Sequence, residues 1–373
     1  MPAPAELLAT PFSAHYPAGI EEWIDVYGYA VPLTFGDPLA EYTAVRTAVG
    51  ITEYSMLYKW HVTGPGAVPC VDAIFSRSVT SQPTGRISYG VIVTDHGCMV
   101  DDVTVAVHRP DLVVVTGGNP DTAHHLAAAA PEGTTVTERR SETAVLSLQG
   151  PRSREVLQTL TTTPVDNHAL PYYQFRTDLD LAGIPAQVNR LGFTAELGYE
   201  LQVPVERAGD LWHAVTDAGQ PLGLRPFAAA ALMMCRVEAG MIMGGLEYDE
   251  RTSPYECRMG WAIDLDKGPF QGREALAAAK DTAPTRLVSI NLGPGQSDAD
   301  GVTLHHEGVP VGHITMAVPS PHLGGDLLAL ARITPTAAKV GTALTAALPD
   351  GTTRTGQVVA TPVYDPQRSR VRA

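Results

Sequence analysis

Apolar and polar positions alternate along three consecutive segments between residues 87 and 118. The segments read ISYGVIVT, MVDDVTVAVH and DLVVVTGG, and a turn at Asp95-His96-Gly97 separates the first from the second. Period-two alternation interrupted by turn residues is typical of β-strands that are neighbours in a sheet. We therefore expect a meander of three strands in this part of the chain.

Apolar residues spaced three or four positions apart predict helices on either side of this meander. One helix is expected at Pro38–Ala48 and another at 205–218. The segment FAAAALMMCRVEAGM is apolar on nearly every face and should form a buried helix. Its Arg236 then needs an anionic partner, which we expect to be Glu238 or Glu256, or else the carboxylate of a ligand.

From Arg286 onward, short apolar segments are separated by turns rich in Gly, Pro and Asp. The segments are RLVSINL, GVTLHH, VPVGHITMAV, DLLALARI, GTALTAAL and TGQVVATPV. They predict an all-β domain of about six strands, which is typical of a barrel or a sandwich. A chain of 373 residues exceeds one ordinary core, so two or three domains are expected.

The segment Val188–Pro204 combines two extended runs with a polar connection. Glu196 lies between Gly192 and Gly198 in that connection. Because one carboxylate accepts two parallel hydrogen bonds, this glutamate suits a flat heterocycle with adjacent N–H donors. The alternative is a β-hairpin whose loop carries a glutamate without a binding role.

Two consecutive carboxylates, Asp101 and Asp102, stand inside an otherwise apolar strand. Aspartate has a poor strand propensity, and adjacent residues on a strand point to opposite faces. One of the two should therefore face water and the other the interior or a cleft. The alternative is a strand end at which both acids are exposed.

The composition excludes several classes of protein. The formal net charge is −14, with 26 basic residues among 40 acidic ones, which argues against a nucleic-acid surface. No apolar run approaches the roughly 18–20 residues that span a bilayer, so no membrane role is expected. The N-terminal residues lack the pattern of a signal peptide, and we expect a cytoplasmic protein.

No metal site is expected either. The four cysteines are far apart and form no CxxC pair, and the twelve histidines include no HExxH or HxH motif. We therefore interpret the cysteines as reduced packing residues.

Taken together, these segments resemble the folate-dependent aminomethyltransferase family. Its best-known member is the T-protein of the glycine cleavage system, and it includes tetrahydrofolate-dependent demethylases. The resemblance runs nearly the whole length of the chain. The matching segments, in order, are YGYAVPLTFG, AVRTAVGI, ISYGVIVTDHGCMVDDVTV, LQGPRS, RLGFTAELGYELQVP, CRVEAG and SPYECRMGWAIDLDKGPFQGREAL, followed by the β-rich end.

The resemblance implies an α+β fold with three lobes around a central channel that holds tetrahydrofolate. Residues 1–51 and 140–279 would form a first mixed α/β lobe that binds folate. Residues 52–139 would form an inserted second lobe of mixed α/β structure that carries Asp101, and residues 280–373 a C-terminal β-barrel.

The resemblance also implies which residues bind the cofactor, as tetrahydrofolate or as its 5-methyl or 5,10-methylene form. Glu196 would bind the pyrimidine edge of the pterin, and Arg236 would lie near the folate. Tyr89 would belong to the channel wall, where Thr116 replaces an asparagine of the family.

Asp101 falls on the first acid of the family's Asp-Asp pair, near the folate nitrogens. A carboxylate there orients N5, stabilises developing positive charge and takes a proton. We therefore expect Asp101 to be catalytic and to contact the cofactor, and Asp102 to be structural.

The chain departs from the T-protein pattern at several positions. Where that pattern has Asp-Val-Ser-His-Met, this chain reads Glu53-Tyr54-Ser55-Met56-Leu57, and an Arg-Asp pair of the buried helix is replaced by Leu232-Met233. Folate binding survives these departures better than the aminomethyl specificity does.

We therefore expect a tetrahydrofolate-dependent one-carbon transferase that acts on a small molecule. The leading hypothesis is methyl transfer between an O-, S- or N-methyl compound and folate N5, with Tyr29, His61 and Tyr172 as candidate substrate-binding acids by residue type. The first alternative is the glycine-cleavage T-protein itself, with a lipoyl carrier protein as partner. The second is a non-catalytic folate-binding factor for iron–sulfur assembly. A monomer or homodimer is expected.

Overall fold

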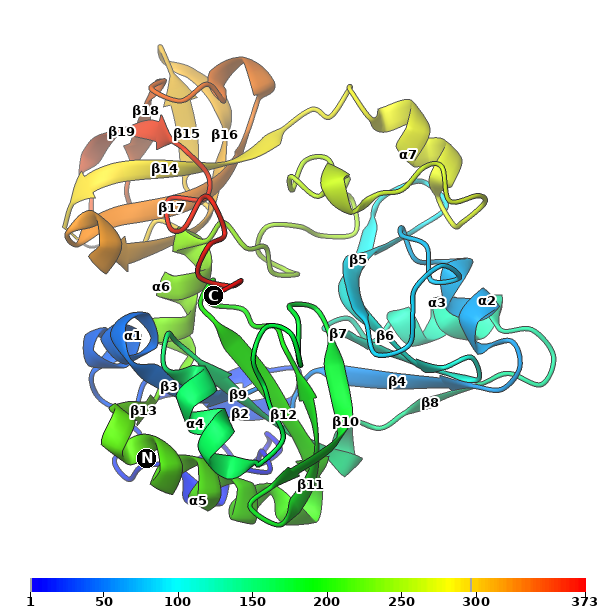
Figure 1. Ribbon diagram of the computed structural model, residues 1–373. Helices are drawn as coiled ribbons and strands as arrows, with labels where there is room; N and C mark the ends of the chain where they lie inside the picture. The colour runs from blue at the N-terminus through cyan, green and yellow to red at the C-terminus, as the bar shows by residue number, and fades with distance from the viewer. Residues whose placement is uncertain (1, 296) are drawn as a thin grey trace.

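A computed structural model describes residues 2–295 and 297–373. Its strands form three sheets and a short N-terminal ribbon, and Figure 1 shows the sheets as three separate bodies. Two of the bodies carry packed helices, and the third is a barrel. The C-terminal segment, red in Figure 1, runs back from the barrel toward the first body.

The first body is a six-stranded sheet with the order β10-β11-β12-β9-β3-β13. Its strands are β3 (Val49–Glu53), β9 (Thr143–Gln149), β10 (Phe175–Leu181), β11 (Ile184–Asn189), β12 (Gly198–Pro204) and β13 (Leu224–Pro226). Helices α4 (Ser153–Leu160) and α5 (Ala208–Gly219) pack on one face, where alternate strand residues such as Leu146 and Leu201 enter the core. Burial of this face holds the helices in place.

The second body is a five-stranded sheet with the order β5-β6-β7-β4-β8. Its elements are β4 (Tyr58–Thr63), α2 (Ala67–Asp72), β5 (Ile87–Val93), β6 (Met99–Arg109), β7 (Leu112–Gly117), α3 (Thr122–Ala129) and β8 (Thr135–Glu138). Strands β5, β6 and β7 are consecutive and antiparallel, so the predicted meander is confirmed. Apolar side chains such as Val103, Val115 and Leu126 form the core under α2 and α3.

The third body is a closed barrel with the order β14-β17-β16-β15-β18-β19. Its strands are β14 (Arg286–Pro294), β15 (Thr303–His306), β16 (Val309–Ser320), β17 (Asp326–Ile333), β18 (Ala343–Ala347) and β19 (Thr353–Val359). Closure leaves no strand edge unpaired, and it decides between the barrel and the sandwich that the sequence left open.

The remaining elements connect these bodies. They are β1 (Trp23–Val26), β2 (Tyr29–Pro32), α1 (Pro38–Thr47), α6 (Ala229–Glu238) and α7 (Arg273–Ala279), with 3₁₀ turns at Ser13–His15, Arg140–Glu142, Val205–Arg207, Gln220–Leu222, Gly260–Ala262, Pro321–Leu323 and Pro335–Ala337. Helix α6 contacts both α1 and the barrel strands β16 and β17, so it is buried as its composition predicts. The predicted α+β class with a C-terminal barrel is confirmed, and the lobe boundaries stay a prediction.

Candidate active site

Asp101 and Asp102 point to opposite faces of the five-stranded sheet. Asp101 faces the helices and is 1% exposed. Its carboxylate accepts hydrogen bonds from the N–H groups of Gly118 (3.3 Å) and Asn119 (3.1 Å) and from the hydroxyl of Thr122 (3.0 Å). Burial, and then the charge of Asp102, raise its pKa to about 8. Asp101 therefore ties the end of β7 to the first turn of α3.

Asp102 faces the other side of the sheet, where tyrosine hydroxyls hold its carboxylate. The Tyr89 hydroxyl donates to Oδ2 at 2.7 Å, and the Tyr248 hydroxyl donates to Oδ1. Burial raises the pKa of Asp102 to about 6, although these two hydrogen bonds lower it. The group is thus an ionised base near neutral pH that also accepts a proton readily.

A row of cross-strand partners continues this face of the sheet. Tyr89 pairs with Thr104, Thr104 with Thr116, and Thr116 with Lys59. The Lys59 ammonium donates to the carbonyl oxygens of Ser55 (3.1 Å) and Leu57 (2.8 Å), and burial lowers its pKa to about 8. The face therefore carries a fixed cation beside Thr116.

Glu200, on the six-stranded sheet, interacts with this cation through its charge. Its neighbours on β12, Tyr199 and Leu201, enter the apolar core, so Glu200 points to the face opposite α4 and α5. Burial raises its pKa to about 7, opposed by the Asn189 amide and by the charge of Lys59. The only hydrogen bond that the described residues give its carboxylate is a long one of 3.5 Å from Asn189.

Tyr54 places a second polar group with unfilled hydrogen-bonding capacity near Glu200. In the described part of the chain, the buried Tyr54 hydroxyl has no hydrogen-bond partner of normal geometry, although Ser147 lies close to it. Burial and the Glu200 charge raise the pKa of Tyr54. A buried polar group without a partner costs free energy, and a bound ligand would supply the missing partner.

Glu196 lies apart from these groups and is already engaged within the chain. Its Oε1 accepts from Arg46 Nη1 at 3.3 Å and from the Tyr364 hydroxyl, and Arg370 Nη1 lies 3.5 Å from Oε2. Burial raises its pKa, and these partners oppose the shift. Glu196 thus joins α1 to the C-terminal segment, and its contact with a pterin stays a prediction.

Arg236 forms an ion pair that the sequence interpretation missed. Its Nη1 lies 2.6 Å from Oε2 of Glu247, and both side chains are fully buried. The expected partners were wrong, because Glu238 binds Arg46 at 2.9 Å and Glu256 accepts from the Thr285 hydroxyl. Glu247 lies in an irregular loop after α6, and no periodic pattern places such a loop against a helix. Arg236 is therefore paired inside the protein, and its place near the folate stays a prediction.

The three substrate candidates lie on different elements. Tyr29, on β2, is buried under the Arg140 guanidinium, whose Cζ lies 5.0 Å from the centre of its ring. His61 is on β4, where burial and then the charge of Arg139 lower its pKa. Tyr172 packs against Tyr173, with ring centres 4.6 Å apart. Among the described residues, none of the three hydrogen-bonds to Asp102 or Glu200, and their substrate roles stay predictions.

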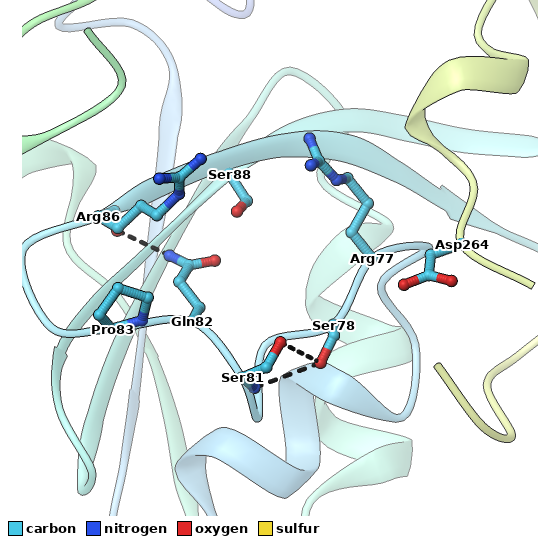
Figure 2. Close-up of a pocket in the computed structure, with 8 residues that line it drawn as sticks. All are labelled: Arg77, Ser78, Ser81, Gln82, Pro83, Arg86, Ser88 and Asp264. Atoms are coloured by element: carbon cyan, nitrogen blue, oxygen red, sulfur yellow. Dashed lines mark hydrogen bonds between the residues drawn. The ribbon is translucent and has the colours of Figure 1, made fainter. Parts of the chain in front are cut away.

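A pocket of about 330 Å³ lies on the helix side of β5 (Figure 2). It is lined by Arg77, Ser78, Ser81, Gln82, Pro83, Arg86, Ser88 and Asp264. The Arg77 guanidinium donates to the carbonyl oxygen of Tyr89 at 3.3 Å. The pocket is thus behind Tyr89, on the face opposite Asp102, and none of the predicted site residues lines it.

Two family models cover most of the chain. The GCVT N-terminal domain matches residues 18–267, and the glycine cleavage T-protein C-terminal barrel domain matches residues 286–365. The chain belongs to the glycine cleavage T-protein family.

Relatives of known name agree with this assignment. The aminomethyltransferase of Thermotoga sp. (strain RQ2) is 31% identical over 357 residues, which are 95% of this chain and 96% of that protein. The trimethylamine-oxide aldolase of Ruegeria pomeroyi is 31% identical over 378 residues, which are 98% of this chain but 48% of that longer protein. The glycine cleavage system aminomethyltransferase T of Bartonella henselae has the same fold, with a TM-score of 0.86 at 20% identity over 96% of this chain and 98% of that one.

Membership of the T-protein family confirms the predicted resemblance, and it confirms that the protein is an enzyme that transfers one-carbon units.

Among the described residues, no group of three or more His, Cys, Asp or Glu side chains is arranged to hold a metal ion. Likewise, no helix within the described ranges is long and apolar enough to cross a membrane.

The sequence interpretation did not single out Glu200, and it assigned Asp102 a structural role. The signal for Glu200 is its place between the buried Tyr199 and Leu201, because strict alternation puts it on the polar face of β12. No equivalent signal separates Asp101 from Asp102, since the alternation of β6 only says that they diverge. The position of α3 decides which one is covered.

Proposed function

We propose that this T-protein family member is a tetrahydrofolate-dependent one-carbon transferase. In the form that we favour, the enzyme moves a methyl group between an O-, S- or N-methyl small molecule and N5 of the folate. The observation that carries the proposal is the Asp102 carboxylate, held by Tyr89 and Tyr248 on the face of the sheet that also carries Lys59, whose charge interacts with Glu200.

The residues around Glu200 fit the pyrimidine edge of a pterin, which presents adjacent N–H donors and a carbonyl acceptor. Glu200 has a carboxylate with spare acceptor capacity, and within the described part of the chain the Tyr54 hydroxyl has no hydrogen-bond partner of normal geometry. A carboxylate accepting two parallel N–H bonds makes the stronger, charge-assisted kind. This geometry favours Glu200 over Glu196, whose oxygens already have partners inside the chain.

Bound folate would supply the nucleophilic N5 that accepts or donates the one-carbon unit. The residue that handles the N5 proton is Asp102 in this proposal. Asp101 was the expectation from sequence, but it is covered by α3 and already accepts three hydrogen bonds. The pKa of Asp102, about 6, suits a general base at neutral pH, since proton transfer is most efficient when the base titrates near the working pH.

The small-molecule donor is favoured by the departures of this chain from the T-protein pattern. Met56 occupies the position of that pattern's histidine, and Leu232-Met233 replaces its Arg-Asp pair. A relative named for trimethylamine oxide, a methylated small molecule, is 31% identical to this chain, the same identity as the Thermotoga aminomethyltransferase has, although the match covers 48% of that longer relative. The second candidate is the aminomethyltransferase itself, with a lipoyl carrier protein, which the full-length match to the Thermotoga relative favours.

One experiment separates the two candidates. The protein is incubated with tetrahydrofolate and either methylated aromatics, N-methyl amines and sulfonium compounds, or an aminomethyl-lipoyl carrier protein. We expect 5-methyltetrahydrofolate from a member of the first set and no ammonia from the second, measured by chromatography and an ammonia assay. Ammonia release together with 5,10-methylenetetrahydrofolate would identify the aminomethyltransferase instead. No folate product in either arm would contradict both candidates.

A further inference from the structure

Tyr27 occupies a backbone conformation that aromatic residues rarely adopt. Val26 pairs with Tyr29 across the N-terminal ribbon, so Tyr27 and Gly28 are the two residues of its turn. Both have positive φ angles, 53° for Tyr27 and 84° for Gly28. Turns of this kind favour Asn or Gly at the first position, and a bulky residue there is a conformational outlier. Such outliers persist where the surroundings hold them, and they concentrate at functional sites.

Polar contacts hold the strained turn from two sides. The Asp25 carboxylate accepts from the Gly28 N–H at 2.7 Å. Arg140 Nη1 donates to the carbonyl oxygen of Tyr27 at 3.0 Å and lies 3.4 Å from that of Met56. The Arg140 guanidinium itself stacks over Tyr58, with Cζ 4.1 Å from the ring centre. The turn that contains Tyr27 is therefore held both by its neighbour Asp25 and by Arg140, which is far away in sequence.

The Tyr27 side chain crosses from this ribbon to the end of the five-stranded sheet. A Cβ atom at Gly118 would lie 2.3 Å from the Tyr27 hydroxyl oxygen, so the two residues are in close contact. A Cβ at Gly117 would meet Asp101 instead, at 2.2 Å. The hydroxyl of Tyr27 and the carboxylate of Asp101 are thus on opposite sides of this segment.

The Tyr27 hydroxyl is on the side of the sheet that carries Asp102. Thr104 pairs with Thr116, and continuing that register by two residues puts Gly118 opposite Asp102. Burial and then the charges of Asp101 and Asp102 raise the pKa of Tyr27 to about 12. The phenol keeps its proton at neutral pH and remains a hydrogen-bond donor. Among the described residues, no acceptor is bonded to that hydroxyl.

We propose that the Tyr27 hydroxyl is the hydrogen-bond donor to an oxygen or nitrogen atom attached to the one-carbon unit that is handled beside Asp102. This inference rests on the proposed function, and it restricts the class of methyl donors that the enzyme would accept. A phenol recognises an atom with an available lone pair, such as an ether oxygen or an uncharged amine nitrogen. It gives nothing to a quaternary ammonium group, so methyl donors that carry an oxygen or a neutral nitrogen are favoured.

The test compares two folates that differ only in the one-carbon substituent on N5. 5-Formyltetrahydrofolate carries a carbonyl oxygen on its N5 substituent, whereas tetrahydrofolate has none. We expect Tyr27→Phe to weaken binding of the formyl compound about tenfold, the loss of one hydrogen bond, and to change tetrahydrofolate affinity less than twofold, by calorimetry. Tyr58→Phe, a matched loss of a neighbouring hydroxyl, should leave both affinities unchanged.

A second variant separates recognition from folding. Asn is preferred over Tyr in the first position of such a turn, so Tyr27→Asn should raise the melting temperature while it selectively weakens 5-formyltetrahydrofolate binding. A parallel loss of affinity for both folates, or no loss for either, would overturn the role of Tyr27. If the parent protein bound neither folate, the proposed function would fail, and this inference would fail with it.

Discussion

The Tyr89 hydroxyl donates a hydrogen bond of 2.7 Å to the Asp102 carboxylate from the adjacent strand of the same sheet. Tyr248, from the loop after α6, holds the other carboxylate oxygen. The base is therefore positioned by two parts of the chain that are far apart in sequence. Its neighbour Asp101 is held as firmly, but on the covered side of the sheet.

The first prediction distinguishes these two aspartates. Asp102→Asn should slow one-carbon transfer by about 100-fold or more, because the positioned base is lost, while tetrahydrofolate affinity stays close to that of the parent. Asp101→Asn should mainly lower stability, by about 1–3 kcal/mol, because the amide NH₂ cannot accept the hydrogen bonds of the carboxylate. Folate product formation and urea denaturation measure the two effects. A severe loss of turnover in a stable Asp101 variant would restore the assignment expected from sequence.

The second prediction concerns the cofactor. Glu200→Gln should weaken tetrahydrofolate binding by about 1.5–3 kcal/mol, the range for hydrogen bonds to a charged group, as measured by calorimetry. Glu196→Gln is the matched control, and it should lower the melting temperature by loosening Arg46 and Tyr364 while retaining folate affinity. The opposite pattern would place the pterin at Glu196.

The third prediction tests the buried pair of Arg236 and Glu247. Glu247→Gln leaves an unpaired buried guanidinium, and breaking a buried ion pair costs about 3–5 kcal/mol of unfolding free energy. The double variant Arg236→Met, Glu247→Leu should recover most of this loss, because neither charge remains. Denaturant unfolding of the single and double variants gives the coupling. A single variant as stable as the parent would show that the pair is not part of the core.

The fourth prediction is the pH dependence of stability. Burial raises the folded-state pKa of Asp101 to about 8, of Glu200 to about 7 and of Asp102 to about 6, all above their unfolded values. Between about pH 4 and pH 8 the folded state therefore binds more protons than the unfolded state, and stability falls as pH rises. Asp101→Asn should flatten this slope in denaturation at fixed pH values. A slope that is unchanged in the variant would contradict the burial of that carboxyl.

Activity should depend on pH in the opposite direction at the acid end. Transfer needs Asp102 ionised, so kcat/KM should fall as the pH is lowered through about 6. The profile for a methyl donor identified by product formation measures this, and a rate independent of pH between 5 and 7 would exclude Asp102 as the base.

The sequence by itself determined much of this protein. Alternation gave the meander of β5 to β7, helical spacing gave α1, a nearly continuous apolar composition gave α6, and the turn-rich end gave six strands of one domain. The ordered motifs gave the family. These features are local, because each depends on periodicity or on the residues next to it in the chain.

The tertiary structure alone decided which polar groups meet. Alternation says that Asp101 and Asp102 diverge, but the packing of α3 decides that Asp101 is the covered one. Arg236 needed an anion by its burial alone, whereas the loop after α6 decided that the anion is Glu247. Nothing in the local sequence around Tyr27 indicates its contact with Gly118, which follows a strand of another sheet. Such pairings depend on long-range packing, which no local pattern encodes.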